Sequence, residues 1–226
     1  MANHYKLSPS DLTFLWDECP RCFYLKVVHG FGRPFSPFPS IFNKIDKLMK
    51  EHFNGHPAEE VSPELPKGRI EAGERWVESQ PIVIPGIGAS AYIRGKFDAV
   101  IAFDSGSYAV IDFKTSETRA EHVAFYGRQL HAYAYALENP GLNKLQLAPV
   151  THLGLLSVAP AAMEIDEQEM VSYIGKITWQ PIPKDEVGFL RFMEQVLSVL
   201  ACENPPEPNP KCGYCEYRQA SRENGW

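Results

Sequence analysis

Apolar side chains recur every three to four residues in four stretches of the chain. This spacing places them on one face of an amphipathic helix. The clearest stripe follows Ser40, a residue type that favours the position before a helix, and it includes Ile41, Ile45 and Phe53. The pattern therefore predicts helices over residues 10–19, 40–53, 120–137 and 185–200.

Short segments rich in β-branched and aromatic residues occupy the middle of the chain. Asp104, Ser105 and Gly106 supply a turn between two of them, which predicts a hairpin. The order of elements predicts an α/β fold in which helices flank a central mixed β-sheet, and we expect residues 1–226 to form one domain. The expected strands are 81–87, 91–103, 108–113, 152–158 and 177–182.

The composition is that of a folded protein. Of the 226 residues 44% are hydrophobic and 22% are charged, which excludes a disordered chain. No stretch approaches the ~18 apolar residues that a membrane helix needs, and no export signal is visible at the start, so we expect a cytoplasmic protein with no membrane partner. The net charge of −6 argues against a protein that coats nucleic acid, but not against an enzyme with one local nucleic-acid groove.

Three charged residues interrupt the apolar strands in the middle of the chain. Asp112 and Lys114 are two residues apart on one expected strand, so their side chains point to the same face. The turn at 104–106 folds the neighbouring strand back and can place Asp98 beside them. Two carboxylates next to an amine suit a hard divalent cation such as magnesium. The alternative is an ordinary surface ion pair between these acids and Lys114.

The motifs around these residues resemble those of a known enzyme family. Gly95-x-x-Asp98, Val110-Ile111-Asp112-Phe113-Lys114-Thr115 and Gln129-x-x-x-Tyr133 are similar, in order and spacing, to the motifs of the PD-(D/E)XK nuclease superfamily, in its RecB-type branch. The likeness extends over about residues 7–217. It implies a restriction-endonuclease-like fold with a nuclease core over about residues 40–200.

The resemblance also implies which residues act in the site. On the early helix, His52 lies within the apolar stripe, where a histidine is more often a core residue than a metal ligand. The catalytic residues would be Asp98, Asp112, Lys114, Gln129 and Tyr133. The ligands of Mg²⁺ or Mn²⁺ would be Asp98, Asp112, the backbone carbonyl of Phe113 and, from the early helix, Asp46.

Substrate and partners are implied by the resemblance alone. It implies phosphodiester hydrolysis in DNA by an exonuclease-like enzyme that acts on single strands or DNA ends in repair, recombination or defence. A helicase or another recombination or defence protein would be a partner. The alternative is a non-catalytic nucleic-acid-binding or regulatory metal-cluster protein of the same fold. Phosphates would follow a local path of cations at Arg94, Lys96, Arg119 and Arg128.

Four of the five cysteines form two close pairs at opposite ends of the chain, Cys19 with Cys22 and Cys212 with Cys215. Each pair can bind one metal centre, and two pairs supply four thiolates. Such a centre would be a clasp that joins the N-terminal helix, within about residues 8–30, to the C-terminal tail at about 203–219. The alternatives are buried free thiols or a redox pair.

The RecB-type resemblance implies an iron–sulfur cluster at these cysteines. In the iron–sulfur members, which include the CRISPR-adaptation and AddB-type exonucleases, one early cysteine joins a late C-x2-C-x5-C group. The last of those positions is Ser221 in this sequence, and Cys22 would supply the missing thiolate. The expected cofactor is a [4Fe–4S] cluster. Zn²⁺ is the alternative, because four cysteines also suit tetrahedral zinc.

Overall fold

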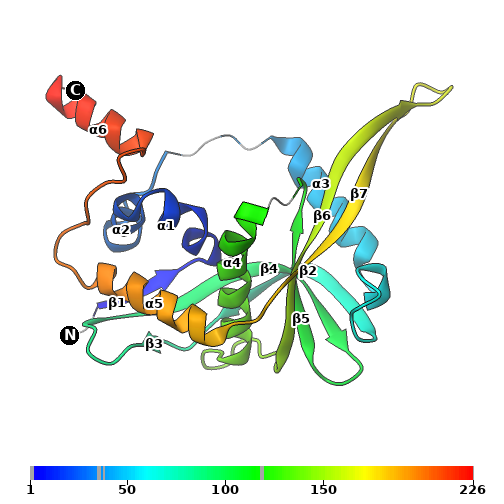
Figure 1. The fold of residues 1–226 in the computed structure, drawn as a ribbon, viewed down its shortest axis with the longest axis horizontal. Coiled ribbons are helices and arrows are strands. Elements are labelled where there is room, and N and C mark those ends of the chain that lie inside the picture. The colour runs from blue at the N-terminus through cyan, green and yellow to red at the C-terminus, as the bar shows by residue number, and fades with distance from the viewer. Residues whose placement is uncertain (1–2, 35–36, 38, 118–119, 226) are drawn as a thin grey trace.

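The computed structural model describes residues 3–34, 37, 39–117 and 120–225, and its strands join into one mixed sheet. The order across the sheet is β1-β4-β5-β6-β7, and β2 and β3 also pair with the long β4. Figure 1 shows helices packed around this sheet, which confirms the predicted α/β architecture. The strands are β1 (Asn3–Leu7), β2 (Gly68–Glu78), β3 (Ile82–Val83), β4 (Ala89–Phe103), β5 (Tyr108–Lys114), β6 (Val150–Ile165) and β7 (Val171–Ile182).

The helices occur at both ends of the chain and between the strands. The α-helices are α1 (Phe14–Glu18), α2 (Pro20–His29), α3 (Ser40–Phe53), α4 (Ala120–Glu138), α5 (Glu186–Leu200) and α6 (Gly213–Glu223), and the 3-10 helices are η1 (Pro9–Leu12) and η2 (Ala58–Glu60). Within the described residues, no helix combines the length and the apolar character needed to cross a membrane.

β4 and β5 form the predicted hairpin. They are antiparallel, with Ala99 opposite Ile111 and Ala102 opposite Tyr108. Gly106 in the turn has a φ of 83°, a conformation that glycine adopts without steric cost. After β5 the chain crosses through α4 to β6, which pairs with β5 in parallel. This crossover places α4 against the strands that carry the candidate acids.

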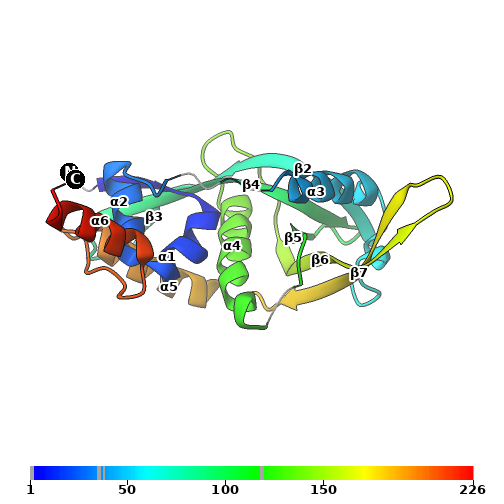
Figure 2. The ribbon, with the colours of Figure 1, turned by 90° about the horizontal axis from the view of Figure 1, so that it is seen from above.

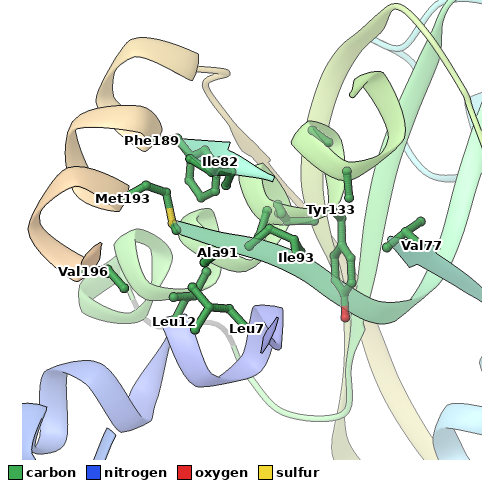
Figure 3. Packing of buried hydrophobic residues seen from close by; sticks show 14 of the residues in the cluster. Leu7, Leu12, Val77, Ile82, Ala91, Ile93, Tyr133, Phe189, Met193 and Val196 are labelled. Carbon is green, nitrogen blue, oxygen red and sulfur yellow. The ribbon is translucent and has the colours of Figure 1, made fainter. Parts of the chain in front are cut away.

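The larger core lies between the sheet and helices α4 and α5. Leu130 and Leu137 of α4 and Met193 of α5 are fully buried there. Figure 3 shows Met193 packing over β4 close to Ala91 and Ile93. Burial of each large apolar side chain contributes about 1.5–3 kcal/mol relative to its exposure. The apolar stripes of these two helices therefore fix their position over the sheet.

A second core lies on the other face of the sheet, against α3. Met49 and Phe53 of α3 pack there with Ile101 of β4 and Ile111 of β5. Val110, the neighbour of Ile111, belongs to the first core, as expected for side chains that alternate along a strand. The strands of the hairpin are therefore covered on both faces.

Some predicted boundaries are wrong because local pattern was overridden by pairing and packing. β2 is not among the predicted strands, since its sequence GRIEAGERWVE mixes charged and apolar residues. It nevertheless pairs with β4 from Gly68 to Glu78, with one irregularity between Ala72 and Arg75. The polar and proline-containing segment 55–68 contributes Val61 and Leu65 to the second core. Ser40 is the first helical residue and not the cap, a position that Pro39 holds. His52 is exposed and does not belong to the core.

The two ends of the chain also hold elements that the pattern did not predict. The helix expected over 10–19 is divided into η1 and α1, and α2 follows directly; β1 and α6 are further additions. The strands at 152–158 and 177–182 are longer than expected and form a hairpin that extends beyond the rest of the molecule (Figures 1 and 2). The C-terminal tail returns to the N-terminal helices, because the sulfur atoms of Cys212 and Cys215 lie within 4.8 Å of those of Cys19 and Cys22.

Replacement of Leu130 by alanine tests the larger core. This side chain is fully buried on α4, so we expect Leu130→Ala to lower the free energy of unfolding by about 2–5 kcal/mol, through lost burial and a residual cavity. Denaturant unfolding measures the change. Leu142→Ala is the matched control, because Leu142 is 89% exposed, and its effect should stay within about 0.5 kcal/mol. Equal effects of the two substitutions would contradict the assigned core.

Candidate active site and cysteine centre

Asp98 and Asp112 lie side by side at the end of the β4–β5 ladder. The ladder pairs Ala99 with Ile111, and the next residues in this register are Asp98 and Asp112. The backbone N–H of Phe113 donates to Asp98 Oδ2 at 3.0 Å. The hairpin therefore brings together two carboxylates that are 14 positions apart in the sequence.

Asp112 is the most deeply buried acid of the site, at 3% exposure. Its Oδ1 accepts a hydrogen bond of 3.1 Å from Gln129 Nε2 of α4. Its Oδ2 forms an ion pair with Lys114 but accepts no hydrogen bond of normal geometry. Burial, with a further contribution from the neighbouring Asp98, raises the pKa of Asp112 to about 6, although Lys114 opposes this shift. The buried carboxylate is thus stabilised by the Lys114 ammonium, and it holds a proton more readily than an exposed aspartate does.

Lys114 faces Asp112, as the two-residue spacing predicts. Its side chain is mostly buried, and its ammonium also lies 4.1 Å from the centre of the Tyr126 ring. Burial disfavours the charged form, but Asp112 outweighs it, so the pKa of Lys114 is raised and the group stays protonated. The site therefore keeps a fixed positive charge next to its most buried carboxylate.

Tyr133 lies one helical turn from Gln129 on α4. Its hydroxyl donates to the carbonyl of Lys96 at 2.5 Å, and its ring packs near Phe97. Burial raises the pKa of Tyr133, which keeps the phenol neutral. In Figure 3 its ring stands beside β4. Tyr133 therefore ties α4 to β4 two residues before Asp98.

Close packing explains why the motif that ends at Asp98 begins with a glycine, Gly95. A Cβ atom at this position would lie 2.7 Å from Pro9 Cδ and 3.3 Å from the Tyr133 ring. Any larger residue would push apart the N-terminal segment, β4 and α4. The glycine is therefore needed for close packing next to the site.

The sequence did not predict Lys50 and Glu74 as site residues, but the structure places both of them in the site. Lys50 Nζ is 2.8 Å from Asp98 Oδ1, 2.8 Å from Asp46 Oδ2 and 3.6 Å from Glu74 Oε1. Burial lowers the pKa of Lys50, but Asp46 and Asp98 outweigh this effect and raise it. The spacing of four residues from Asp46 to Lys50 is a signal for this pair. Glu74 carried no such signal, because it sits at an irregularity in the unpredicted β2.

Asp46, the predicted ligand from the early helix, is connected to the site through Lys50. Among the residues that the structure describes, three or more ligand atoms gather within 4.8 Å of one another only in the four cysteines and in His52, His56 and Glu60. Asp46 therefore does not converge with Asp98 and Asp112 into a cluster of three carboxylates.

The expected path of cations for phosphates is largely neutralised by acids. Arg94 pairs with Glu78, Lys96 with Glu74 and Arg128 with Asp17. Arg119 lies outside the described residues. Arg94 and Lys96 also flank the ring of Trp76, which is exposed on β2.

The four paired cysteines meet at the opposite end of the molecule from the long hairpin. Their Sγ atoms all lie within 4.8 Å of one another, and Cys19, Cys22 and Cys212 are buried. Burial opposes ionisation, but neighbouring thiols and a backbone N–H lower the pKa of Cys212 to about 7. Cys202, the fifth cysteine, is exposed and lies outside the group. The predicted meeting of the two pairs is confirmed.

Arg33 supplies positive charge beside this cysteine group. Its NH2 nitrogen donates to Cys212 Sγ at 3.6 Å, and its NH1 nitrogen forms an ion pair with Glu18. The guanidinium also lies 4.6 Å from the centre of the Tyr214 ring. An arginine held in this way stabilises thiolates, the form of cysteine that binds metal.

The family model of the PD-(D/E)XK nuclease superfamily matches residues 49–220, more than half of the chain. The chain belongs to this superfamily, as its motifs predicted. Membership suggests metal-dependent nuclease activity on a nucleic acid, for which such enzymes typically use Mg²⁺ or Mn²⁺.

A solved structure supports the fold. The crystal structure of SSO0001 aligns with a TM-score of 0.50 and 18% sequence identity, and the alignment covers 95% of this chain and 84% of that chain. At this identity the similarity concerns the fold alone. No curated protein matches the sequence.

The raised pKa of Asp112 predicts a pH dependence of stability without added divalent metal. An unfolded carboxyl ionises near its ordinary value of 3.8, and the folded one near about 6. Between these values the folded chain holds the additional proton, so its free energy of unfolding falls as pH rises. Relative to Asp112→Asn, the wild type should lose on the order of 1–3 kcal/mol from pH 4 to pH 7. Denaturant unfolding of both proteins measures this, and parallel pH profiles would contradict it.

Proposed function

We propose that this protein is a metal-dependent DNA nuclease of the RecB-type branch of its superfamily. The observation that carries the proposal is the buried carboxylate of Asp112, which lies beside Asp98 and forms an ion pair with Lys114. Two adjacent carboxylates, one of them buried, suit a hard cation. A surface ion pair, the alternative drawn from the sequence, would not require such burial.

Asp98, Asp112 and the carbonyl of Phe113 would hold Mg²⁺ or Mn²⁺. When bound, the ion supplies Lewis-acid polarisation of a phosphodiester oxygen and an acidified water. Lys114 keeps its proton and stabilises negative charge that develops on the phosphoryl oxygens. Gln129 orients the Asp112 carboxylate through its hydrogen bond to Oδ1. Tyr133 acts as a positioning residue, because its hydroxyl holds the backbone of Lys96.

The proposed substrate is DNA, as single strands or duplex ends, in repair, recombination or defence. A helicase or a related recombination or defence protein is the proposed partner, and the cytoplasm the proposed location. Superfamily membership supports a nucleic-acid substrate. The finer choices rest on the RecB-type resemblance of the motifs.

A non-catalytic relative is the second candidate, and one observation favours it. Lys50 already places an ammonium 2.8 Å from Asp98 and from Asp46, where it offsets the charge that a divalent cation needs. A protein in which this arrangement is permanent would bind nucleic acid without cleaving it.

Removal of Lys114 tests the catalytic proposal. Lys114→Ala should lower the rate of DNA cleavage ~10²–10⁴-fold, while DNA binding persists, because the ammonium acts mainly on the transition state. The assay follows end-labelled single-stranded and duplex DNA with Mg²⁺ or Mn²⁺. Lys144→Ala is the control, since Lys144 is a more exposed lysine paired with Glu78. Wild-type cleavage by Lys114→Ala would assign the lysine to a bystander ion pair.

Metal binding separates the two candidates. Titration calorimetry with Mn²⁺ should give binding heat for the wild type and none for Asp112→Ala. Lys50→Gln should bind Mn²⁺ about 10-fold more tightly or better, because a positive charge next to Asp98 has been removed. Absence of binding heat in the wild type and in Lys50→Gln alike would favour the non-catalytic candidate.

A further inference from the structure

The spacing of the four sulfur atoms discriminates between the two kinds of centre that four cysteines can bind. Cys22 Sγ lies 3.7 Å from Cys212 Sγ and 3.6 Å from Cys215 Sγ, and Cys19 Sγ lies 3.7 Å from Cys215 Sγ. All four sulfurs fall within 4.8 Å of one another. The group is therefore as small as a single coordination sphere.

These distances fit one tetrahedral ion. Four sulfurs at the zinc–sulfur bond length of about 2.3 Å are separated by about 3.8 Å along each edge of the tetrahedron. A [4Fe–4S] cluster puts four iron atoms and four sulfides between the cysteines, which separates their sulfurs by roughly 6 Å or more. The cysteine group of this protein does not fit that cluster.

The local backbone supports the smaller centre, because both pairs are placed in the same way. Cys19 is the N-cap of α2 and Cys22 lies in its first turn; Cys212 is the N-cap of α6 and Cys215 lies in its first turn. Each pair thus presents two sulfurs from the start of a helix, where the positive end of the helix dipole favours thiolates. Two equivalent pairs that face each other complete a tetrahedron.

Burial and packing of the cysteine side chains hold the sulfur atoms at this spacing. Cys19 is fully buried, Cys22 is 2% exposed, and Leu15 packs against the group. Ser221, the position of the late cysteine in the iron–sulfur pattern, is six residues beyond Cys215 on the same helix, about 9 Å along its axis. The fourth sulfur of the group comes from Cys22 instead.

We infer that Cys19, Cys22, Cys212 and Cys215 bind one tetrahedral zinc ion, and not the [4Fe–4S] cluster that the resemblance implies. The ion joins the start of α2 to the start of α6 and takes no part in electron transfer, since zinc has no redox chemistry in proteins. Its role is structural. The inference does not depend on the proposed nuclease activity.

Metal analysis of the purified protein tests the inference. The full chain is produced in medium that contains both iron and zinc, and it is purified without oxygen so that a cluster would survive. We expect one zinc per chain, no sulfide and no colour. About four iron and four sulfide per chain, with broad absorbance near roughly 400 nm, would overturn the inference. Protein that carries neither metal and takes up no added zinc would overturn it equally.

Cobalt provides a second readout of geometry. Co²⁺ replaces zinc in tetrahedral thiolate sites, so one equivalent added to metal-free protein should give the visible spectrum of four-sulfur tetrahedral coordination, and one equivalent of zinc should remove it. Retention of the cobalt signal after excess zinc would contradict a zinc site.

Two serine variants control for the identity of the ligands. Cys22→Ser should lose most of its zinc and melt at a lower temperature than the wild type, whereas Cys202→Ser should keep both values, because Cys202 is exposed and outside the group. If Cys22→Ser fails to fold, the cobalt titration of the wild type still tests the site. Full zinc content in a folded Cys22→Ser protein would overturn the four-cysteine site.

Discussion

The antiparallel pairing of β4 and β5 is the constraint on which the candidate site depends. It sets Asp98 next to Asp112 and lets the Phe113 amide bind Asp98. Two carboxylates so close repel each other and need positive charge. Lys114 supplies it to Asp112, and Lys50 supplies it to Asp98. The hairpin therefore determines where cations, from the protein or from solution, are stabilised.

Burial gives this arrangement its chemical consequence. Asp112 lies between the sheet and α4, where charges interact more strongly than in water. Its negative charge is therefore costly unless a cation or a proton accompanies it, which is why its pKa is raised. In the proposed nuclease, the same cost favours exchange of the proton for a divalent ion near neutral pH.

The cysteine group and the candidate site are linked through the N-terminal segment. The cysteine group brings the start of α2 next to the start of α6, and the preceding Pro9 packs on Gly95, which in turn lies against Tyr133. Tyr133 holds the backbone of Lys96 beside the site. The inferred ion at the cysteines would therefore support, at a distance, the packing that positions Asp98.

Local sequence was enough to predict the hairpin, α3, α4, α5 and the grouping of Asp98, Asp112 and Lys114, because strand alternation, helical periodicity and a glycine turn act over a few residues. It was not enough for β2, or for Lys50 and Glu74, since their roles arise from pairing and ion pairs between distant segments. The motif predicted four cysteines at one centre, but only the tertiary structure determined how far apart their sulfurs lie. That distance depends on how α2 and α6 pack, and our inference of a single ion in place of a cluster rests on it.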